Sequence, residues 1–146
     1  MTKTGLSGLL VACCLVAVCV CYSQRQVKAD EARDLRPKLL GAWGLVGPPA
    51  AEGEPEKGRF KFWGLHHWST TQTNPATGEV VYHHGGTYSL DGDEYIETVR
   101  FAVGASADQL GRSYKFKIKV EGDTYIQTGV DNPYSEKWGR LRKGDE

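Results

Sequence analysis

The run from Ser113 to Val120 alternates between large apolar and lysine side chains more regularly than any other segment of the chain. Its apolar positions are Tyr114, Phe116, Ile118 and Val120, and its lysines are Lys115, Lys117 and Lys119. Successive side chains of a β-strand point to opposite faces, so this run predicts a strand with one buried and one solvated face. Lysines on the solvated face also oppose edge-to-edge aggregation.

Short segments of this kind, separated by turn sequences, occupy most of the chain from residue 39 onward. The Asp-Gly pair in Asp91-Gly92-Asp93 favours a tight hairpin, and Asn74–Gly78 and Glu121–Asp123 predict further turns. The expected strands are Leu39–Val46, Arg59–Trp63, His66–Thr71, Glu79–His84, Thr87–Leu90, Glu94–Phe101, Ser113–Val120, Thr124–Val130 and Glu136–Arg142.

The spacing of these strands predicts an all-β fold. Short strands with turns every 8–12 residues or so are typical of sandwiches and barrels. Successive hairpins without a crossover helix favour a single antiparallel up-and-down barrel of about eight to ten strands, whose closure removes exposed edges. Beyond residue 30 the chain has four tryptophans, six tyrosines and four phenylalanines, enough ring surface to form a small core.

An apolar, uncharged segment from Leu6 to Tyr22 precedes this region and follows Lys3. Residues 1–29 are therefore interpreted as a secretory signal, cleaved after Ala29 or after Ser23, or as an uncleaved membrane anchor formed by residues 6–22. Leu10–Cys13 also spells a lipobox, which makes a lipoprotein the third alternative. Every one of these interpretations predicts an extracytoplasmic domain, secreted, periplasmic or membrane-anchored. Residues 30–38 are expected to be a short linker with a helical turn that ends before Pro37.

Charge and cysteine positions exclude several classes of function for the exported part. Lys3, Arg25 and Lys28 are the charged residues of positions 1–29, so 15 basic and 18 acidic side chains remain beyond them. A mildly acidic domain lacks the basic surface that nucleic acid requires, and no nucleic-acid partner is expected. All four cysteines lie between Cys13 and Cys21, which excludes disulfides and cysteine-based zinc sites from the folded domain.

Several segments, taken in order, resemble the small bacterial lipocalin-like (calycin-type) β-barrel domains, a family of largely uncharacterised function. They are the G-x-W segment Leu40–Val46, the stretch Asn74–Thr98 with TGE and GGTYSL, Lys115–Tyr125, and Glu136–Leu141. The resemblance covers residues 39–143 and implies an antiparallel barrel with a cavity that carries or senses a small, often apolar molecule. It also implies that Trp43 closes one barrel end beneath a basic side chain of the last strand, Arg140 or, second, Arg142. The chain is smaller than the larger secreted lipocalins and lacks their C-terminal helix.

Glu97 is the polar residue that the strand pattern singles out. Tyr95, Glu97, Val99 and Phe101 occupy one face of a predicted strand. Because the other three are apolar or aromatic, this face is expected to point inward and to place a carboxylate inside the barrel. Such a carboxylate needs a hydrogen-bond donor or a cation. The donors expected for it are Tyr88, Gln127 and one of the histidines.

The histidines occur as two adjacent pairs, His66-His67 and His83-His84. Adjacent strand residues point to opposite faces, so each pair offers one nitrogen ligand to the interior. Neither H-x-H nor HExxH spacing is present, and no metal site or other cofactor is predicted.

The function expected from these features is the binding of a small molecule in the barrel cavity. The cavity-wall candidates are Trp68, Tyr88, Glu97, Phe116 and Gln127. Trp63 and Trp68, with Phe60 and Phe62 before them, fit either a pocket mouth or the packed core. A filled barrel that serves as a cell-surface interaction module is the alternative. No nucleophile elbow, P-loop or dinucleotide fingerprint is present, so an enzyme is not expected, and an acid–base pair of Glu97 with a histidine is the one catalytic arrangement considered.

Overall fold

The computed structural model describes residues 34–142. The predicted signal or anchor, residues 1–29, lies outside the described residues, as do all four cysteines. The description below concerns the unit that begins at Leu35. Within residues 34–142, no helix has the length and hydropathy needed to cross a membrane.

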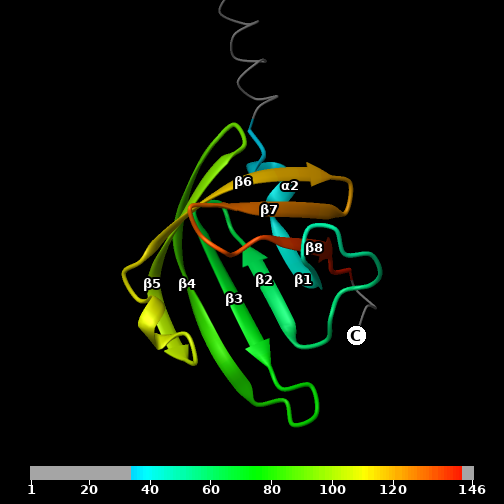
Figure 1. Ribbon diagram of the computed structural model, residues 1–146, viewed down its shortest axis with the longest axis vertical. Coiled ribbons are helices and arrows are strands. Elements are labelled where there is room, and N and C mark those ends of the chain that lie inside the picture. Colours follow the sequence, from blue (N-terminus) through cyan, green and yellow to red (C-terminus); the bar gives the residue numbers. More distant parts are fainter. Residues whose placement is uncertain (1–33, 143–146) are drawn as a thin grey trace, which may run out of the picture. The chain divides into compact units, whose positions relative to one another are not determined.

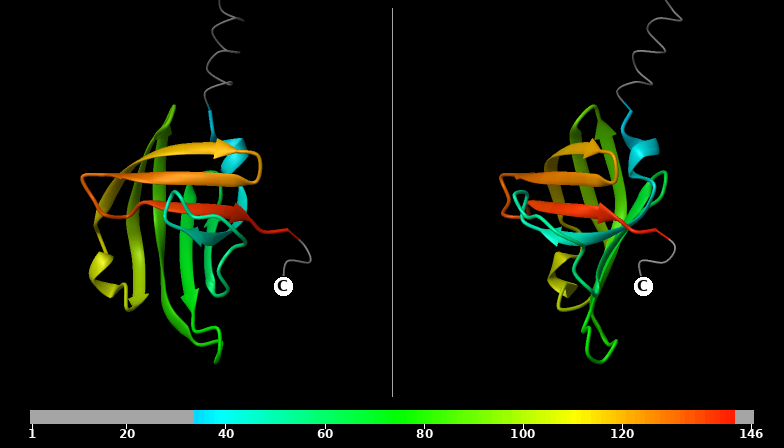
Figure 2. Two further views of the ribbon diagram at one scale, coloured as in Figure 1. Left: turned by 45° about the vertical axis from the view of Figure 1, so that its right-hand side comes forward. Right: turned by 90° about the vertical axis from the view of Figure 1, so that its right-hand side faces the viewer.

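Eight antiparallel strands form a closed barrel in which each strand pairs with the next and the last pairs with the first (Figure 1). The strands are β1 (Gly41–Gly47), β2 (Arg59–Trp63), β3 (His67–Thr73), β4 (Val80–Asp91), β5 (Glu94–Gly104), β6 (Ser113–Glu121), β7 (Thr124–Val130) and β8 (Glu136–Arg140). Figure 2 shows β6, β7 and β8 running steeply across the direction of β3 and β4. The all-β, up-and-down barrel predicted from the turn spacing is confirmed.

The short helix α2 (Arg36–Leu39) precedes β1 and corrects the prediction for the linker. Pro37 lies in its first turn rather than ending it, because a proline there has no intrahelical hydrogen bond to lose. Leu39 is fully buried, and its carbonyl accepts a 2.7 Å hydrogen bond from the Trp43 indole. The helix thus packs against the core, and the first strand begins at Gly41 instead of Leu39.

The β4–β5 pair contains a bulge that overturns one expectation. Gly85 pairs with Phe101 and Gly86 with Val99, which leaves Arg100 as the extra residue of β5. A Cβ on Gly86 would lie 2.7 Å from the Arg100 backbone nitrogen, so this close approach requires glycine. The extra residue reverses the alternation. Phe101 therefore faces outward and is 41% exposed, whereas the sequence had placed it on the inward face with Val99.

The face of β2 that points inward is also the opposite of the one that hydrophobicity alone would favour. Phe62 is 44% exposed and therefore lines neither the core nor a pocket mouth. Lys61 and Trp63 point inward and are 2% and 4% exposed. The pairing with β1 imposes this orientation, because Lys61 lies opposite Trp43, which is fully buried.

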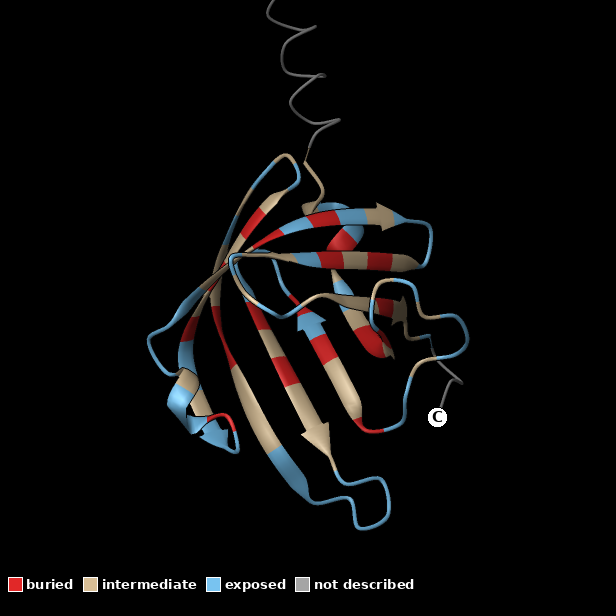
Figure 3. Ribbon diagram, viewed as in Figure 1, coloured by how far each residue is buried: buried red, intermediate tan, exposed pale blue. Residues whose placement is uncertain are grey.

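The barrel interior has two ends that differ in packing. Figure 3 shows the buried residues gathered toward the end where α2 lies, and the lower ends of β4 and β5 in that view mostly intermediate or exposed. We call the first part the closed end. Its side chains form one continuous cluster: Leu39, Trp43, Leu45, Trp63, Tyr95, Phe116, Ile118, Tyr125 and Trp138. The remaining interior, which we call the cavity end, is bounded by Arg59, Tyr82, His84 and Tyr114.

Candidate functional site

A buried ion pair lies where the two ends of the interior meet. Lys61, on β2, donates hydrogen bonds to the Glu97 carboxylate of β5 at 3.0 Å and to the Gln127 side-chain oxygen of β7 at 2.9 Å. The side chains of Lys61 and Glu97 are 3% and 8% exposed. Removing two charges from water is costly unless they pair closely and their remaining hydrogen-bond positions are filled. Lys61 and Glu97 meet the first condition, and the Gln127 oxygen fills a further hydrogen-bond position of Lys61.

Two tyrosine hydroxyls extend the network toward the closed end. Tyr95 donates a 2.7 Å hydrogen bond to Glu97, and Tyr125 donates one of 3.3 Å to Gln127. Burial raises the pKa of each hydroxyl well above its ordinary value, and the negative charge of Glu97 adds to the effect on Tyr95. Both tyrosines therefore remain protonated donors at physiological pH.

The ammonium group of Lys61 is also surrounded by aromatic rings. Five ring centroids lie between 5.0 and 6.0 Å from Nζ: those of Trp63, Trp68, Tyr95, Phe116 and Trp138. Ring faces attract a cation through their quadrupole, and this attraction is stronger where water is excluded. The rings and Glu97 together hold the lysine in one position.

A second ion pair continues the network toward the cavity end. Arg59 donates to Glu136 at 2.6 Å, and Gln127 donates to the other oxygen of Glu136 at 2.9 Å. Gln127 thus joins the two ion pairs, because its oxygen accepts from Lys61 while its nitrogen donates to Glu136. Four strands contribute to this chain of bonds, which makes it a rigid cross-brace inside the barrel.

A cavity of about 200 Å³ lies at the cavity end, beyond this cross-brace. Six rings line it: Trp68, Tyr82, His84, Tyr114, Tyr134 and Trp138. Its charged lining residues are Arg59, Lys61, Glu97 and Glu136, and the rest of the wall is Thr70, Ala105, Ser106, Gln109 and Gln127. Cavities that bind drug-sized ligands usually measure about 300–1,000 Å³, so this one suits a smaller molecule.

His84 is the titratable ring of this wall. Burial and the nearby Lys61 and Arg59 charges lower its pKa from 6.5 to about 4. Its ring stacks on Tyr82 with centroids 5.3 Å apart and lies edge-on to Trp68. His84 is therefore neutral at pH 7 and contributes a flat, uncharged surface.

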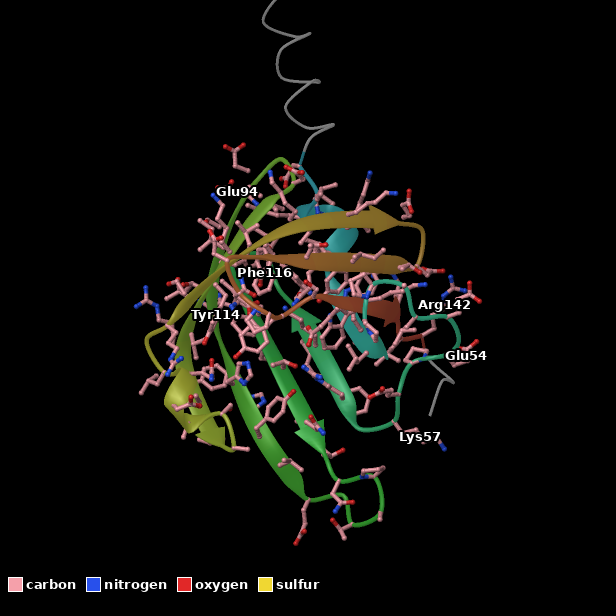
Figure 4. The ribbon with its side chains drawn as sticks, viewed as in Figure 1. Glu54, Lys57, Glu94, Tyr114, Phe116 and Arg142 are labelled. Carbon is pink, nitrogen blue, oxygen red and sulfur yellow. The ribbon has the colours of Figure 1, made fainter. Side chains whose placement is uncertain are left out.

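The connection between β5 and β6 covers one side of the cavity. This segment contains the 3-10 helix η1 (Ala107–Gln109), and the Gln109 side chain accepts a hydrogen bond from the Tyr114 hydroxyl. Tyr114, labelled on β6 in Figure 4, also lies edge-on to Tyr134 with ring centroids 5.2 Å apart. Tyr134 is 40% exposed, so these residues form the rim between the cavity and solvent.

Three of the five predicted wall residues line the cavity, namely Trp68, Glu97 and Gln127. Phe116 lies in the closed-end cluster instead, where its ring stacks on Tyr95. Tyr88 packs against that cluster and donates hydrogen bonds to the carbonyls of Gly64 and Leu65. Whether any of the five binds a ligand stays a prediction.

The donors expected for Glu97 are corrected by the structure. Glu97 is 6% exposed and lies inside the barrel, as its strand face predicted. Its hydrogen bonds come from Lys61 and Tyr95, whereas Gln127 binds Lys61 and Tyr88 binds the backbone. The cation therefore comes from β2, across the barrel interior, and not from the neighbouring strand β4.

The sequence interpretation missed Arg59, Lys61, Tyr82 and Glu136 as interior residues. In Arg59–Trp63 basic and aromatic side chains alternate, and hydrophobicity favours turning the two phenylalanines inward. A different signal was present. A carboxylate predicted inside the barrel requires a cation or a donor there. Lys61 lies two residues before Trp63, the largest ring of that segment, so the two side chains point to the same face of the strand. Turning Trp63 inward would therefore have placed Lys61 inside as well.

The histidines lie on different faces, as alternation predicted for the second pair. His84 lines the cavity, while His83 contacts the Thr71 hydroxyl at 2.5 Å and the outward ring of Phe101. His66 and His67 are exposed. Among residues 34–142, no three His, Cys, Asp or Glu side chains come together as a metal site would require.

Comparison with solved structures identifies the architecture. A lipocalin-like protein from Bacteroides uniformis has a TM-score of 0.51 and 16% sequence identity, over 70% of this chain and 98% of that one. An uncharacterized protein from Bacteroides eggerthii also has a TM-score of 0.51, with 13% identity over 70% of this chain and 99% of that one. The fold is lipocalin-like. Comparisons with protein-family models and with curated proteins found no match.

The closed end of this lipocalin-like barrel has the tryptophan–arginine contact that the G-x-W resemblance implied. The Arg140 guanidinium lies 4.1 Å from the ring centroid of Trp43, its cross-strand neighbour. Arg140 also donates to the carbonyls of Leu40 at 2.9 Å and Lys38 at 2.6 Å. The contact ties β8 to α2 and β1, and none of these residues lines the cavity.

Proposed function

We propose that this lipocalin-like barrel binds a small molecule in the cavity bounded by Arg59, Tyr82, His84 and Glu136. The observation that carries the proposal is a cavity of about 200 Å³ left open beside a rigid polar cross-brace. Binding sites typically combine ring surfaces with a few fixed polar groups that orient the ligand. The cavity end has this composition, and its polar groups are held by the two ion pairs.

The alternative of a completely filled barrel fits the closed end better than the cavity end. At the closed end the rings pack on one another, with Trp63 lying 4.8 Å from Tyr95 and 5.8 Å from Tyr125 between centroids. At the cavity end the rings of Tyr82, Tyr114 and Tyr134 border open space. A filled-core interaction module therefore remains an outcome of the binding experiment and not a second proposal.

The proposal is for binding and not for catalysis. The catalytic arrangement considered from the sequence pairs Glu97 with a histidine as acid and base. The Glu97 carboxylate instead accepts hydrogen bonds from Lys61 and Tyr95, which hold it in a charged, structural role. Both bonds end on Oε2, and none of the described histidines is a hydrogen-bond partner of Glu97, so the acid–base pair considered from the sequence is not assembled.

The proposed site of action is outside the cytoplasm, and it rests on the apolar segment Leu6–Tyr22 behind Lys3. Cell fractionation followed by intact-mass measurement tests it. An exported protein whose first residue is Gln24 or Asp30 supports a cleaved signal. A membrane-bound protein that retains Met1 supports the anchor, and a chain that remains in the cytoplasm contradicts both.

Two alanines of the β5–β6 connection provide a matched test of cavity binding. Ala105 lines the cavity and Ala107 does not, and both are exposed on the same short segment. Ala105→Trp should fill part of the cavity, while Ala107→Trp adds the same ring elsewhere. Native mass spectrometry of protein purified from its own host should show a bound small molecule in the wild type and in Ala107→Trp, and a loss of that mass in Ala105→Trp. Equal retention by both variants would place the ligand elsewhere.

A further inference from the structure

The wall of the cavity is aromatic and polar, with very little aliphatic surface. Six of its side chains are rings, and Ala105 is the one aliphatic side chain among the described lining residues. A cavity for an acyl chain or another flexible hydrocarbon presents leucine, isoleucine, valine or methionine methyl groups, which pack well against such chains. Ring faces instead favour flat partners, which stack on them.

One planar group of the protein already occupies a stacking position. The Arg59 guanidinium lies 6.0 Å from the ring centroid of Tyr82 and 5.9 Å from that of Trp138. Tyr82 and His84 hold consecutive inward positions of β4, and their rings are inclined by only 29°. The wall therefore presents several flat faces next to one another. A planar ligand can stack on them.

The edge of the cavity offers both hydrogen-bond donors and acceptors. Arg59 donates, Glu136 accepts, and Gln127 and Gln109 carry both functions. The Trp138 indole nitrogen and His84 Nδ1 are buried without a hydrogen-bond partner among the described residues. A hydrocarbon ligand would cover the half-buried Arg59, Gln109 and Glu136 and pair with none of them, which is costly, and it would leave the two nitrogens without a partner.

The charges of the wall cancel in pairs. Arg59 is bound to Glu136 at 2.6 Å and Lys61 to Glu97 at 3.0 Å, while His84 is neutral at pH 7. An ionic ligand would therefore find no unpaired charge of opposite sign among the lining residues. A neutral ligand with a polar edge is accommodated without breaking either ion pair.

On these grounds we propose that the ligand is a small, neutral, planar heteroaromatic compound of one or two fused rings, whose edge carries both donors and acceptors. This inference rests on the proposed function and adds the chemical class of the ligand. It departs from the apolar ligand that the resemblance implied. The rings of Tyr82, His84 and Trp138 stack on the compound, and the Arg59–Glu136 pair and Gln127 hydrogen-bond to its edge.

The test compares two classes of probe on the intact exported protein. Adenine, xanthine and pterin represent the proposed class, and decanoate and retinol represent apolar ligands. Binding is followed by quenching of tryptophan fluorescence, since Trp68 and Trp138 line the cavity, and by the rise in Tm that a ligand of the folded state produces. At least one heteroaromatic probe should bind more tightly than decanoate and retinol.

Three variants test whether the heteroaromatic probes bind inside the cavity. Tyr82→Leu removes a stacking face but keeps an apolar side chain, and it should weaken heteroaromatic binding by roughly 5- to 100-fold, the usual worth of one stacked ring. Phe101→Leu is the matched control, because its ring lies on the outer face of the adjacent strand and is 41% exposed. Tyr134→Leu at the exposed rim supports the test if Tyr82→Leu fails to fold.

The outcomes test the ligand class and the proposed binding function separately. Heteroaromatic binding that falls in Tyr82→Leu or Tyr134→Leu, and holds in Phe101→Leu, supports the ligand class. Tight binding of decanoate or retinol with no heteroaromatic binding overturns the ligand class and leaves the proposed function standing. Absence of binding by every probe, together with no retained molecule in the native protein, overturns both.

Discussion

The two ends of the barrel interior are built from similar residues but differ in how completely their side chains are packed. Aromatic rings dominate both ends, yet at the closed end each ring packs on another ring or on Leu39, and at the cavity end several rings face open space. What separates them is the layer formed by Lys61, Glu97 and Gln127. The comparison shows that aromatic content alone does not make a packed core.

The polar layer explains why the cavity end stays open. Lys61 and Glu97 are held by short bonds from several strands, so neither can swing into the cavity to fill it. The closed end supplies the burial that balances the cost of ordering this layer, because Trp43, Tyr95 and Tyr125 are fully buried. The tightly packed core thus lies at one end and the open space at the other.

Trp43→Ala should produce the largest loss of stability. Truncating a fully buried tryptophan costs about 3–5 kcal/mol, out of a total of about 5–15 kcal/mol for a domain of this kind. Tyr82→Ala at the cavity end should cost clearly less, because Tyr82 is only partly buried. Urea unfolding of both variants measures the difference. Equal losses would abolish the distinction between the two ends.

Lys61→Met should destabilise the fold by about 3 kcal/mol, since it leaves the Glu97 charge buried without its partner. The double variant with Glu97→Gln should recover much of this loss, because a neutral amide needs no counter-charge. A double-mutant cycle measured by chemical denaturation gives the coupling of the pair. If the two single losses simply add, the ion pair is not what separates the two ends.

Arg140→Ala should cost about 1–2 kcal/mol through the lost contact with Trp43 and the lost hydrogen bonds to the backbone. Binding in the cavity should not change, because Arg140 does not line it. Thermal melts with and without a cavity ligand separate the two effects. A loss of affinity at unchanged stability would mean that the closed end communicates with the cavity.

The last expected effect is a pH dependence at the cavity end. The unfolded chain protonates His84 near pH 6.5, whereas the folded protein does so only near pH 4. The unfolded state therefore binds more protons in that window, and stability should decline as the pH falls from 6.5 to 4. His84→Gln should flatten this part of the stability curve, measured as Tm against pH. His66→Gln is the control, since His66 is exposed.

Local patterns predicted the strands better than they predicted the interior. The alternation from Ser113 to Val120 gave its orientation correctly, because every apolar residue there shares one parity. The inward position of Glu97 followed from its neighbours in the same way. Phe101 and Phe62 were placed wrongly, since a bulge reversed one strand and cross-strand pairing turned the other.

The sequence by itself determined the all-β class, the order of the hairpins, the aromatic core and the presence of a carboxylate inside the barrel. These follow from periodicity and turn chemistry, which act between near neighbours in the chain. Only the tertiary structure decided which cation meets that carboxylate and where the open space lies. Lys61 and Glu97 are 36 residues apart, and their meeting depends on the register of the strand pairs that join β2 to β5. A shift of one residue in a strand moves every side chain to the other face, so such contacts become definite only when the barrel closes.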